Sequence, residues 1–268
     1  MGWRQSAREK ARSAIAQRDS NVRLCGSDNV AIPLRSIGSS TVKYFKLAGR
    51  LMRFDALDTS GDAFPTYTVG WRIKDEPDEW TRRFLGYKDA RSGYGRAGGE
   101  LLLAAFQELL QVSGLEPGDV LICTAFGHAA TGPNPDSILF KTGAYIAEQT
   151  GASWFPELFA KKKHKSLRLV GDGAARDAEV NGKYWSGTVA KGKTVIVLDD
   201  FVTRGATLGE MHRALHEGCP GTPMIALALG KNETASFGRY CNLPVNNEHI
   251  PAEWATLWQQ QYDKAVKK

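Results

Sequence analysis

Residues 194–208 place the strongest constraint on the fold of this chain. They read TVIVLDDFVTRGATL: a run of mostly branched apolar residues, two adjacent carboxylates, and a turn of small and hydroxyl residues that opens a helix. A continuous apolar run is typical of a strand buried on both faces, as in a parallel sheet. A helix N-terminus after such a strand offers unpaired backbone N–H groups and a favourable dipole to an anion. The segment therefore predicts a phosphate site at the carboxyl end of a buried strand.

The two carboxylates, Asp199 and Asp200, need a separate explanation, because carboxylates repel phosphate. They suit neutral hydroxyl groups, such as those of a ribose, or a divalent cation shared with the ligand. The hydroxyls of Thr203 and Thr207 can hydrogen-bond an anion, and Gly205 lets the backbone approach it closely. A solvated turn after an ordinary strand is the alternative interpretation.

Strand and helix patterns alternate along the second part of the chain. Continuous apolar runs predict strands over residues 119–124, 194–198 and 223–229, with weaker candidates over 154–159 and 183–185. Apolar periodicity predicts helices over residues 98–114, 136–151, 207–216 and 253–266. This alternation predicts an α/β fold, with a mostly parallel sheet flanked by helices on both faces.

The first 97 residues have a different pattern. A thin helical stripe covers residues 3–17, and short β-like runs cover 42–47 and 66–73, separated by turn-rich pieces. We therefore predict two domains. Residues 1–97 would form an N-terminal helix and a small β-rich lobe, and residues 98–268 would hold the main sheet.

Composition limits the classes of protein to consider. With 42% hydrophobic and 24% charged residues, the chain has a globular composition, and a net charge of +6 does not by itself argue for nucleic acid. No apolar stretch approaches the roughly 18 residues of a membrane span, and the N-terminal residues lack the apolar block of a signal peptide, so we expect a cytoplasmic protein. The four cysteines form no pair at zinc-ligand spacing, and we expect them to be reduced and mostly buried.

The strand, acidic pair and loop resemble the signature of the type I phosphoribosyltransferases. In that family a hydrophobic strand, two acidic residues and a Thr/Gly-rich loop hold phosphoribosyl pyrophosphate. The resemblance implies that Asp199 and Asp200 are catalytic, contact the ribose hydroxyls, and meet magnesium directly or through the ligand. The residues implied to cradle the terminal phosphate are Thr203, Arg204, Gly205, Ala206 and Thr207, of which Arg204 stands where the family often has Thr or Gly.

The resemblance extends from about residue 119 to 229 and is closest to the competence protein F-like branch. It implies a pyrophosphate-binding loop over residues 125–134, with Gly127 and His128 as binding residues. It also implies a mobile basic loop over residues 161–176, which brings Lys161, Lys163 and Arg176 to the ligand. The N-terminal cysteine set of that branch is absent here, and residues 1–97 lie outside the resemblance.

Several of these residues also have a structural interpretation. The basic run that begins at Lys161 could be a solvated surface, and Arg176 could simply lie on a loop. A single histidine such as His128 is more often structural than catalytic. Four aromatic residues could stack on a base, but scattered aromatic residues are more often part of a core: Trp71, Trp80, Tyr87 and Tyr94.

The sequence thus predicts a magnesium-dependent phosphoribosyltransferase, a glycosyltransferase of nucleotide metabolism. It would transfer phosphoribosyl between phosphoribosyl pyrophosphate and a base-like nitrogen of a small acceptor, and the resemblance also implies a homodimer. Two alternatives stay open, because a fold does not decide a function. One is a regulator that senses phosphoribosyl pyrophosphate or a nucleotide, in contact with nucleic acid, and the other is an accessory factor of DNA uptake.

Overall fold

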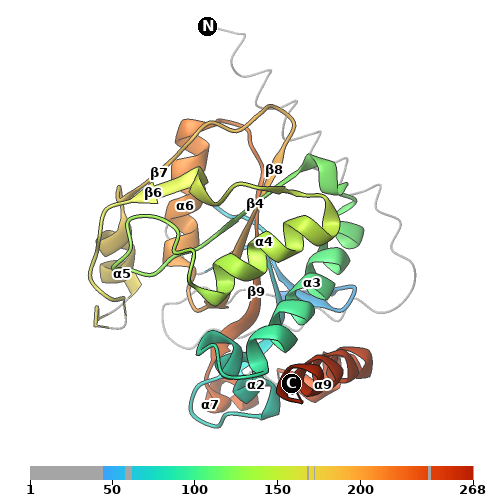
Figure 1. The fold of residues 1–268 in the computed structure, drawn as a ribbon. Helices are drawn as coiled ribbons and strands as arrows, with labels where there is room; N and C mark the ends of the chain where they lie inside the picture. Colours follow the sequence, from blue (N-terminus) through green and yellow to red (C-terminus); the bar gives the residue numbers. More distant parts are fainter. Residues whose placement is uncertain (1–44, 58–61, 168, 172, 241–242, 268) are drawn as a thin grey trace, which may run out of the picture. The chain divides into compact units, whose positions relative to one another are not determined.

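The structure, a computed structural model, describes residues 45–57, 62–167, 169–171, 173–240 and 243–267. Its centre is a seven-stranded sheet in the order β1-β2-β3-β9-β8-β4-β5 (Figure 1). Five neighbouring strands are parallel: β3 (Thr66–Ile73), β9 (Met224–Glu233), β8 (Thr194–Val202), β4 (Val120–Thr124) and β5 (Ser153–Trp154). At one edge, β1 (Phe45–Ala48) and β2 (Leu51–Phe54) add antiparallel strands. The prediction of an α/β fold with a mostly parallel sheet is confirmed.

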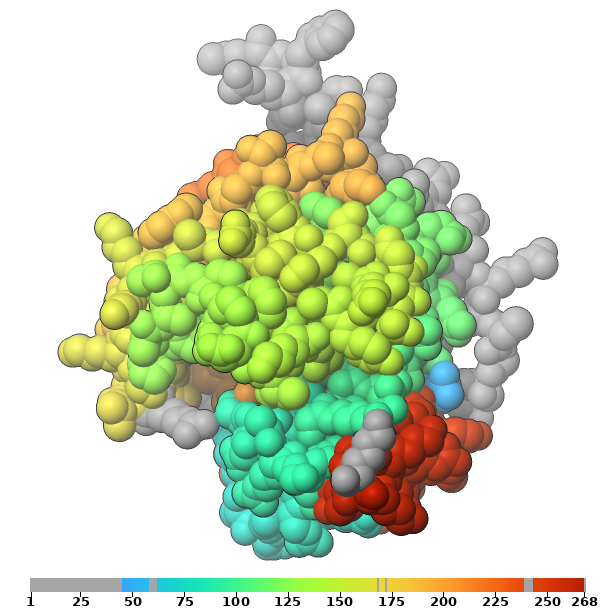
Figure 2. Space-filling view, viewed as in Figure 1, coloured from blue at the N-terminus to red at the C-terminus, as the bar shows by residue number. Residues whose placement is uncertain are grey.

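Helices cover both faces of the sheet because the strands are apolar on both faces. In β8, Ile196 and Leu198 pack into one apolar layer with α2 (Glu79–Lys88), α3 (Tyr94–Ser113), α4 (Ile138–Thr150) and α9 (Ala252–Val266). Val195 and Val197 pack into a second layer with α6 (Ala206–Gly218). Figure 2 shows α9, in red, lying against the teal residues of α2 and α3. Among the described helices, none has both the length and the apolar character needed to cross a lipid bilayer.

A second sheet contains only β6 (Phe159–Lys161) and β7 (Tyr184–Ser186), which pair antiparallel. The connection between them includes α5 (Gly173–Val180). Short helical elements complete the described chain: the 3-10 turns Pro117–Asp119 and Pro156–Leu158, α7 (Ala235–Tyr240) and α8 (Asn246–His249). The aromatic side chains of Trp71, Trp80 and Tyr87 are buried in the two apolar layers, which is the core interpretation of these residues.

The described part of the N-terminal segment belongs to the main sheet. The strand over residues 66–73 has its predicted bounds, but it pairs with β9 inside the sheet, where a separate β-rich lobe was expected. Residue 98, the expected domain boundary, lies inside α3. The difference has a physical reason: the partner of β3 lies about 160 positions further along the chain, and such pairing leaves no local pattern. The predicted helix over residues 3–17, the start of the strand predicted at residue 42, Cys25 and Cys241 lie outside the described residues.

Candidate functional site

The connections that follow β4 and β8 run toward opposite edges of the sheet. From β4 the chain passes through α4 to β5 on one side, whereas from β8 it passes through α6 to β9 on the other. In open α/β sheets, ligands bind outside the carboxyl ends of the strands where the connections diverge in this way. The loops after the two strands begin next to each other, because the N–H of Ala125 donates to the carbonyl oxygen of Leu198 at 2.8 Å. The predicted acidic pair and phosphate loop therefore lie at a position that favours ligand binding.

A cavity of about 570 Å³ opens at the carboxyl ends of β8, β9 and β3. This volume is within the roughly 300–1,000 Å³ of small-molecule sites. Every residue from 199 to 208 lines the cavity, together with Asn232 of β9. Among the described lining residues, five side chains are cationic and two are carboxylates: Arg72, Lys74, Lys88, Arg176 and Arg204 against Asp199 and Asp200. The excess of positive charge favours an anionic ligand.

The two carboxylates lie within β8, which continues to Val202, four residues beyond the predicted strand. Consecutive residues of a strand point to opposite faces. Asp200 forms an ion pair with Lys88 at the end of α2, on the first face. Asp199 lies toward the second face, where Tyr184 of β7 packs. Burial raises the pKa of Tyr184, and the negative charge of Asp199 raises this pKa further, so the two side chains are near each other. The acidic pair thus contains two carboxyl groups in different surroundings.

Asp199 has the more unusual protonation behaviour. Burial raises the pKa of its carboxyl group well above the usual range, and the neighbouring charge of Asp200 adds to the shift. The backbone N–H of Asp200 donates to Asp199 Oδ1 at 2.8 Å, and the N–H of Phe201 donates to Asp200 Oδ1 at 2.7 Å. A carboxyl group with a raised pKa takes up a proton more readily and can then donate a hydrogen bond to a ligand hydroxyl.

Gly205 turns the chain from β8 into α6. Its φ is 86°, in the left-handed region, and a Cβ at this position would lie 2.9 Å from Cβ of Leu57, closer than real atoms approach. Only glycine fits this turn without a shift of its neighbours. As the N-cap residue, Gly205 has no side chain that could bind the N–H groups of the first helical turn. These groups and Thr207 therefore form the end of the cavity that could hold an anion.

The other two side chains of the loop are held by neighbouring elements. The amide nitrogen of Asn232 donates to Thr203 Oγ1 at 2.7 Å, which ties the loop to β9. The Arg204 guanidinium packs so closely against Gly173 of α5 that a Cβ on Gly173 would overlap it. Arg204, the departure from the family pattern, thus joins the loop to α5.

Four of the predicted binding residues do not line this cavity: Gly127, His128, Lys161 and Lys163. The Lys161 side chain is only 1% exposed, and its Nζ donates to the carbonyl oxygen of His128 at 3.0 Å. The same Nζ lies 5.8 Å from the ring centre of Phe126 and 5.5 Å from that of Tyr184, and burial lowers the pKa of Lys161 to about 8. Lys161 therefore fastens the loop after β4 to β6, whereas Lys163 is exposed.

The structure brings cationic residues to the cavity that the sequence patterns did not single out. Arg72 and Lys74 lie at the end of β3, and Lys88 at the end of α2. Their signal in the sequence is weak, because two cations after an apolar strand are common on protein surfaces. Arg176, which was predicted, also lines the cavity, and its Nε donates to the carbonyl oxygen of Val170 at 3.2 Å.

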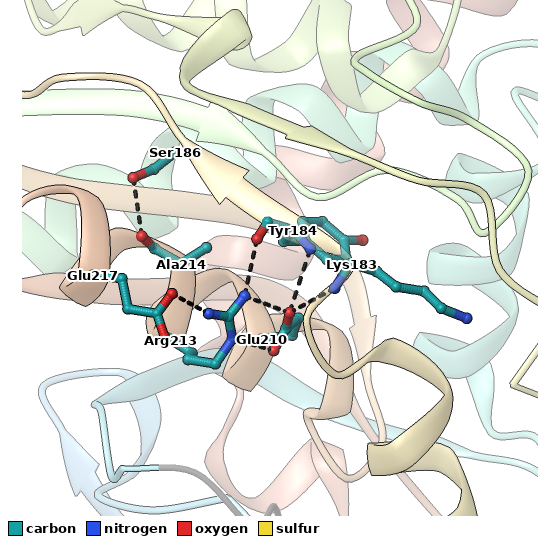
Figure 3. Close-up of polar contacts among 7 residues, drawn as sticks. All are labelled: Lys183, Tyr184, Ser186, Glu210, Arg213, Ala214 and Glu217. Carbon is teal, nitrogen blue, oxygen red and sulfur yellow. Dashed lines mark hydrogen bonds and ion pairs between the residues drawn. The ribbon is translucent and has the colours of Figure 1, made fainter.

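An ion pair between the buried Glu210 and the partly exposed Arg213 fixes α6 to the second sheet (Figure 3). Glu210 accepts hydrogen bonds from the backbone N–H groups of Lys183 at 3.0 Å and Tyr184 at 3.3 Å. Arg213 donates to both oxygens of Glu210 and, at 2.9 Å, to the carbonyl oxygen of Tyr184. Because α6 begins at the cavity, this pair helps to hold the first turn of the helix in place.

The residues at the cavity do not fit a magnesium ion held by the protein alone. Within the described ranges, no group of three or more His, Cys, Asp or Glu side chains is arranged to hold a metal. Proteins usually hold magnesium through one or two carboxylates together with substrate phosphates. Here Asp200 already pairs with Lys88, and the raised pKa of Asp199 weakens it as a ligand.

Comparison with known proteins does not place the chain in a family: no family model matches it, and no curated protein matches it. A functional interpretation therefore depends on the sequence pattern and on the cavity.

Proposed function

We propose that the protein is a phosphoribosyltransferase that binds phosphoribosyl pyrophosphate and transfers its sugar to or from a nitrogen of a small acceptor. One observation carries this proposal: the segment 199–208 lines a cavity in which two carboxyl groups lie beside the open N-terminus of α6. A phosphorylated sugar combines the two features that this arrangement complements, a charged phosphate and neutral hydroxyl groups.

The reaction assigns separate roles to the two ends of the cavity. The first turn of α6 binds the 5-phosphate, while Asp199 and Asp200 hydrogen-bond the ribose hydroxyls. The bond between the sugar carbon and the diphosphate oxygen breaks, and its electron pair leaves with the diphosphate. The acceptor nitrogen then bonds to the same carbon and loses its proton to the departing diphosphate. The Asp200 carboxylate, held by Lys88, favours positive charge on the sugar, and the cationic side chains favour negative charge on the leaving group.

Magnesium has a limited place in this proposal. The protein supplies two carboxyl groups in different surroundings and no complete ligand set among its described residues. We therefore propose that the ion arrives bound to the diphosphate, as a part of the substrate. No step of the mechanism is assigned to an ion held by the protein.

A second candidate, a sensor that binds the phosphorylated sugar without transferring it, is favoured by one observation. The loop after β4, which the resemblance assigns to the pyrophosphate, does not line the cavity, and Lys161 holds it by the contact with His128. A protein that only binds the ligand does not need this loop to reach the leaving group.

Calorimetry with phosphoribosyl pyrophosphate and magnesium tests both candidates. We expect the wild-type protein to bind and Asp200→Asn to bind about tenfold more weakly or worse, because a hydrogen bond to a charged group contributes about 1.5–3 kcal/mol. Asp119→Asn is the matched control, since Asp119 is exposed at the amino end of β4, away from the cavity. Absence of binding by folded wild-type protein would refute both candidates. Pyrophosphate release with a panel of nucleobases then separates the enzyme from the sensor.

A further inference from the structure

A second, smaller cavity of about 320 Å³ lies between α5 and α6. These two helices are side by side in the fold (Figure 1). His212 and His216 of α6 line this cavity, and so does Asp62 from the connection between β2 and β3. We call this cavity the α6 groove. Among the described lining residues, Ala206 is the one that the groove shares with the larger cavity, so its histidines belong to a separate site.

The two histidines of the α6 groove are spaced for one shared ligand. Residues four positions apart lie on the same face of a helix, with Cβ atoms about 5–6 Å apart. The rings of His212 and His216 are nearly parallel, with an interplanar angle of 22° and ring centres 6.5 Å apart. The buried Phe64 stacks on the ring of His212, at 5.1 Å between ring centres and an interplanar angle of 23°. This stacking holds the His212 ring in a defined orientation.

The ring nitrogens of this pair are available to a ligand. Within the described part of the chain, no hydrogen bond or ion pair engages the ring of His212 or of His216. His216 is exposed and His212 is partly exposed, so a solute can reach both rings. Burial lowers the pKa of His212, whereas the negative charge of Asp62 opposes this shift, which shows that a carboxylate lies near the ring.

Two imidazoles at this spacing are a chelating pair for a transition-metal ion. Imidazole nitrogen suits Zn²⁺, Ni²⁺ and Cu²⁺, whereas Mg²⁺ prefers oxygen ligands. A metal–nitrogen bond is about 2.0–2.1 Å long, so the two rings have to approach by side-chain rotation, which the exposed position of His216 allows. No three His, Cys, Asp or Glu side chains of the described residues are arranged around one point, so water completes the coordination of an ion held by the pair.

The chain has another pair of neighbouring histidines, which is less suited to a metal ion. The ring centres of His128 and His164 are 6.3 Å apart, but the rings are tilted by 56° and belong to two different loops. Nδ1 of His164 donates to the carbonyl oxygen of Lys165 at 2.8 Å. Burial lowers the pKa of His164, and the positive charges of Lys161 and Lys183 lower it further. The same charges repel a metal cation, whereas Asp62 attracts one to the α6 groove.

We propose that His212 and His216 bind one divalent transition-metal ion, Zn²⁺, Ni²⁺ or Cu²⁺, in the α6 groove, where the negative charge of Asp62 favours the cation. The inference is independent of the proposed transferase function, and the ion is distinct from magnesium that arrives with a diphosphate. An ion held across one turn of α6 stabilises this helix, because it binds the folded chain in preference to the unfolded chain.

Titration calorimetry of the full-length protein without an affinity tag tests the site, with NiCl₂ as the probe and MgCl₂ as the comparison. We expect Ni²⁺ to bind and Mg²⁺ not to bind. His216→Ala should weaken Ni²⁺ binding at least about tenfold, because the second imidazole of a chelating pair binds intramolecularly. His212→Ala should have the same effect. His128→Ala, which removes an exposed histidine of the other pair, is the matched control and should bind as the wild type does.

Electron paramagnetic resonance of the protein loaded with one equivalent of Cu²⁺ adds a direct readout of the ligands. The wild-type spectrum should show coupling to two imidazole nitrogens, and the His216→Ala spectrum should show coupling to one. Circular dichroism checks that the variant is folded, which the exposed position of His216 favours.

Three results would overturn the site. One is Ni²⁺ binding by folded His216→Ala that is as tight as in the wild type, together with an unchanged copper spectrum. Another is Mg²⁺ binding as tight as that of Ni²⁺, because carboxylates and not imidazoles would then hold the ion. The third is loss of Ni²⁺ binding in His128→Ala, which would place the metal at the other histidine pair.

Discussion

The turn at Gly205 gives the sharpest test of the structure, through the substitution Gly205→Ala. A residue with a side chain meets two obstacles there. The φ of 86° lies in the left-handed region, which costs an L-residue about 1–2 kcal/mol. The new Cβ would also lie 2.9 Å from Cβ of Leu57, which is buried, so the turn or its neighbour must shift. Overpacking of this kind typically costs about 1–3 kcal/mol.

Gly221→Ala separates the two contributions. Gly221 has a φ of 85°, nearly the same as Gly205, but a Cβ at this position meets no atom within 4 Å. The control should therefore lose only the backbone contribution of about 1–2 kcal/mol, whereas Gly205→Ala should lose a total of about 2–5 kcal/mol. The difference between the two variants, about 1–3 kcal/mol, measures the contact with Leu57.

Urea denaturation at 25 °C, followed by fluorescence and circular dichroism, measures both losses of unfolding free energy. Calorimetry with phosphoribosyl pyrophosphate adds a functional readout, because a shift of the turn displaces the N–H groups of α6. We expect Gly205→Ala to bind more weakly and Gly221→Ala to bind as the wild type does. If Gly205→Ala is no less stable than Gly221→Ala, the packing of the turn against Leu57 is not as described.

Three further predictions concern buried charges. Asp199→Asn should stabilise the protein at pH 7 and weaken sugar binding. The folded state raises the pKa of Asp199 above the unfolded value of 3.8, so the wild-type protein loses stability as the pH rises from the unfolded to the folded pKa. Urea unfolding between pH 4 and 7 should therefore show that the difference in unfolding free energy between variant and wild type decreases toward low pH. Lys161 has a folded pKa of about 8 against 10.5 when unfolded, so wild-type stability should gain on Lys161→Met as pH rises from 8 to 10; a constant gap would contradict this. Glu210→Ala leaves two backbone N–H groups without their buried acceptor and should cost about 1–3 kcal/mol, whereas Glu217→Ala, which removes the exposed partner of Arg213, should cost clearly less in the same denaturation assay.

The sheet elements that the sequence predicts best are those with strong local patterns. The run over residues 194–198 is apolar on both faces, and Gly205 marks the turn. The order of strand, turn and helix from β8 to α6 can therefore be predicted without knowing which strands pair with β8. The strand over residues 66–73 also has its predicted bounds. The place of that strand in the sheet was not readable, because β3 and β9 pair across about 160 residues. Only the structure therefore shows that Arg72 and Lys74, at the end of this strand, lie at the site.

Two side chains show how tertiary contacts override local preference. Carboxylates are disfavoured in strands, so the sequence predicts that the strand ends at Leu198; pairing of Asp199 with Ala228 on β9 extends it instead. A lysine in a basic run reads as solvated or mobile, yet Lys161 is buried, because the carbonyl oxygen of His128 and two aromatic rings receive its ammonium group. The partners of Asp199 and of Lys161 lie far from them in the sequence, so no local pattern indicates these contacts.

The extension of β8 changes the meaning of the acidic pair. Two neighbouring residues at a loop can turn toward one ligand, but two neighbouring residues inside a strand point to opposite faces. Asp199 and Asp200 nevertheless line one cavity, because the cavity lies beyond the end of the sheet, where the spaces on both faces meet. A ligand that contacts both carboxyl groups must therefore lie across the strand end, with one hydroxyl toward each face. This arrangement requires β8 to end at Val202 and the chain to turn sharply into α6, and Gly205 makes that turn possible.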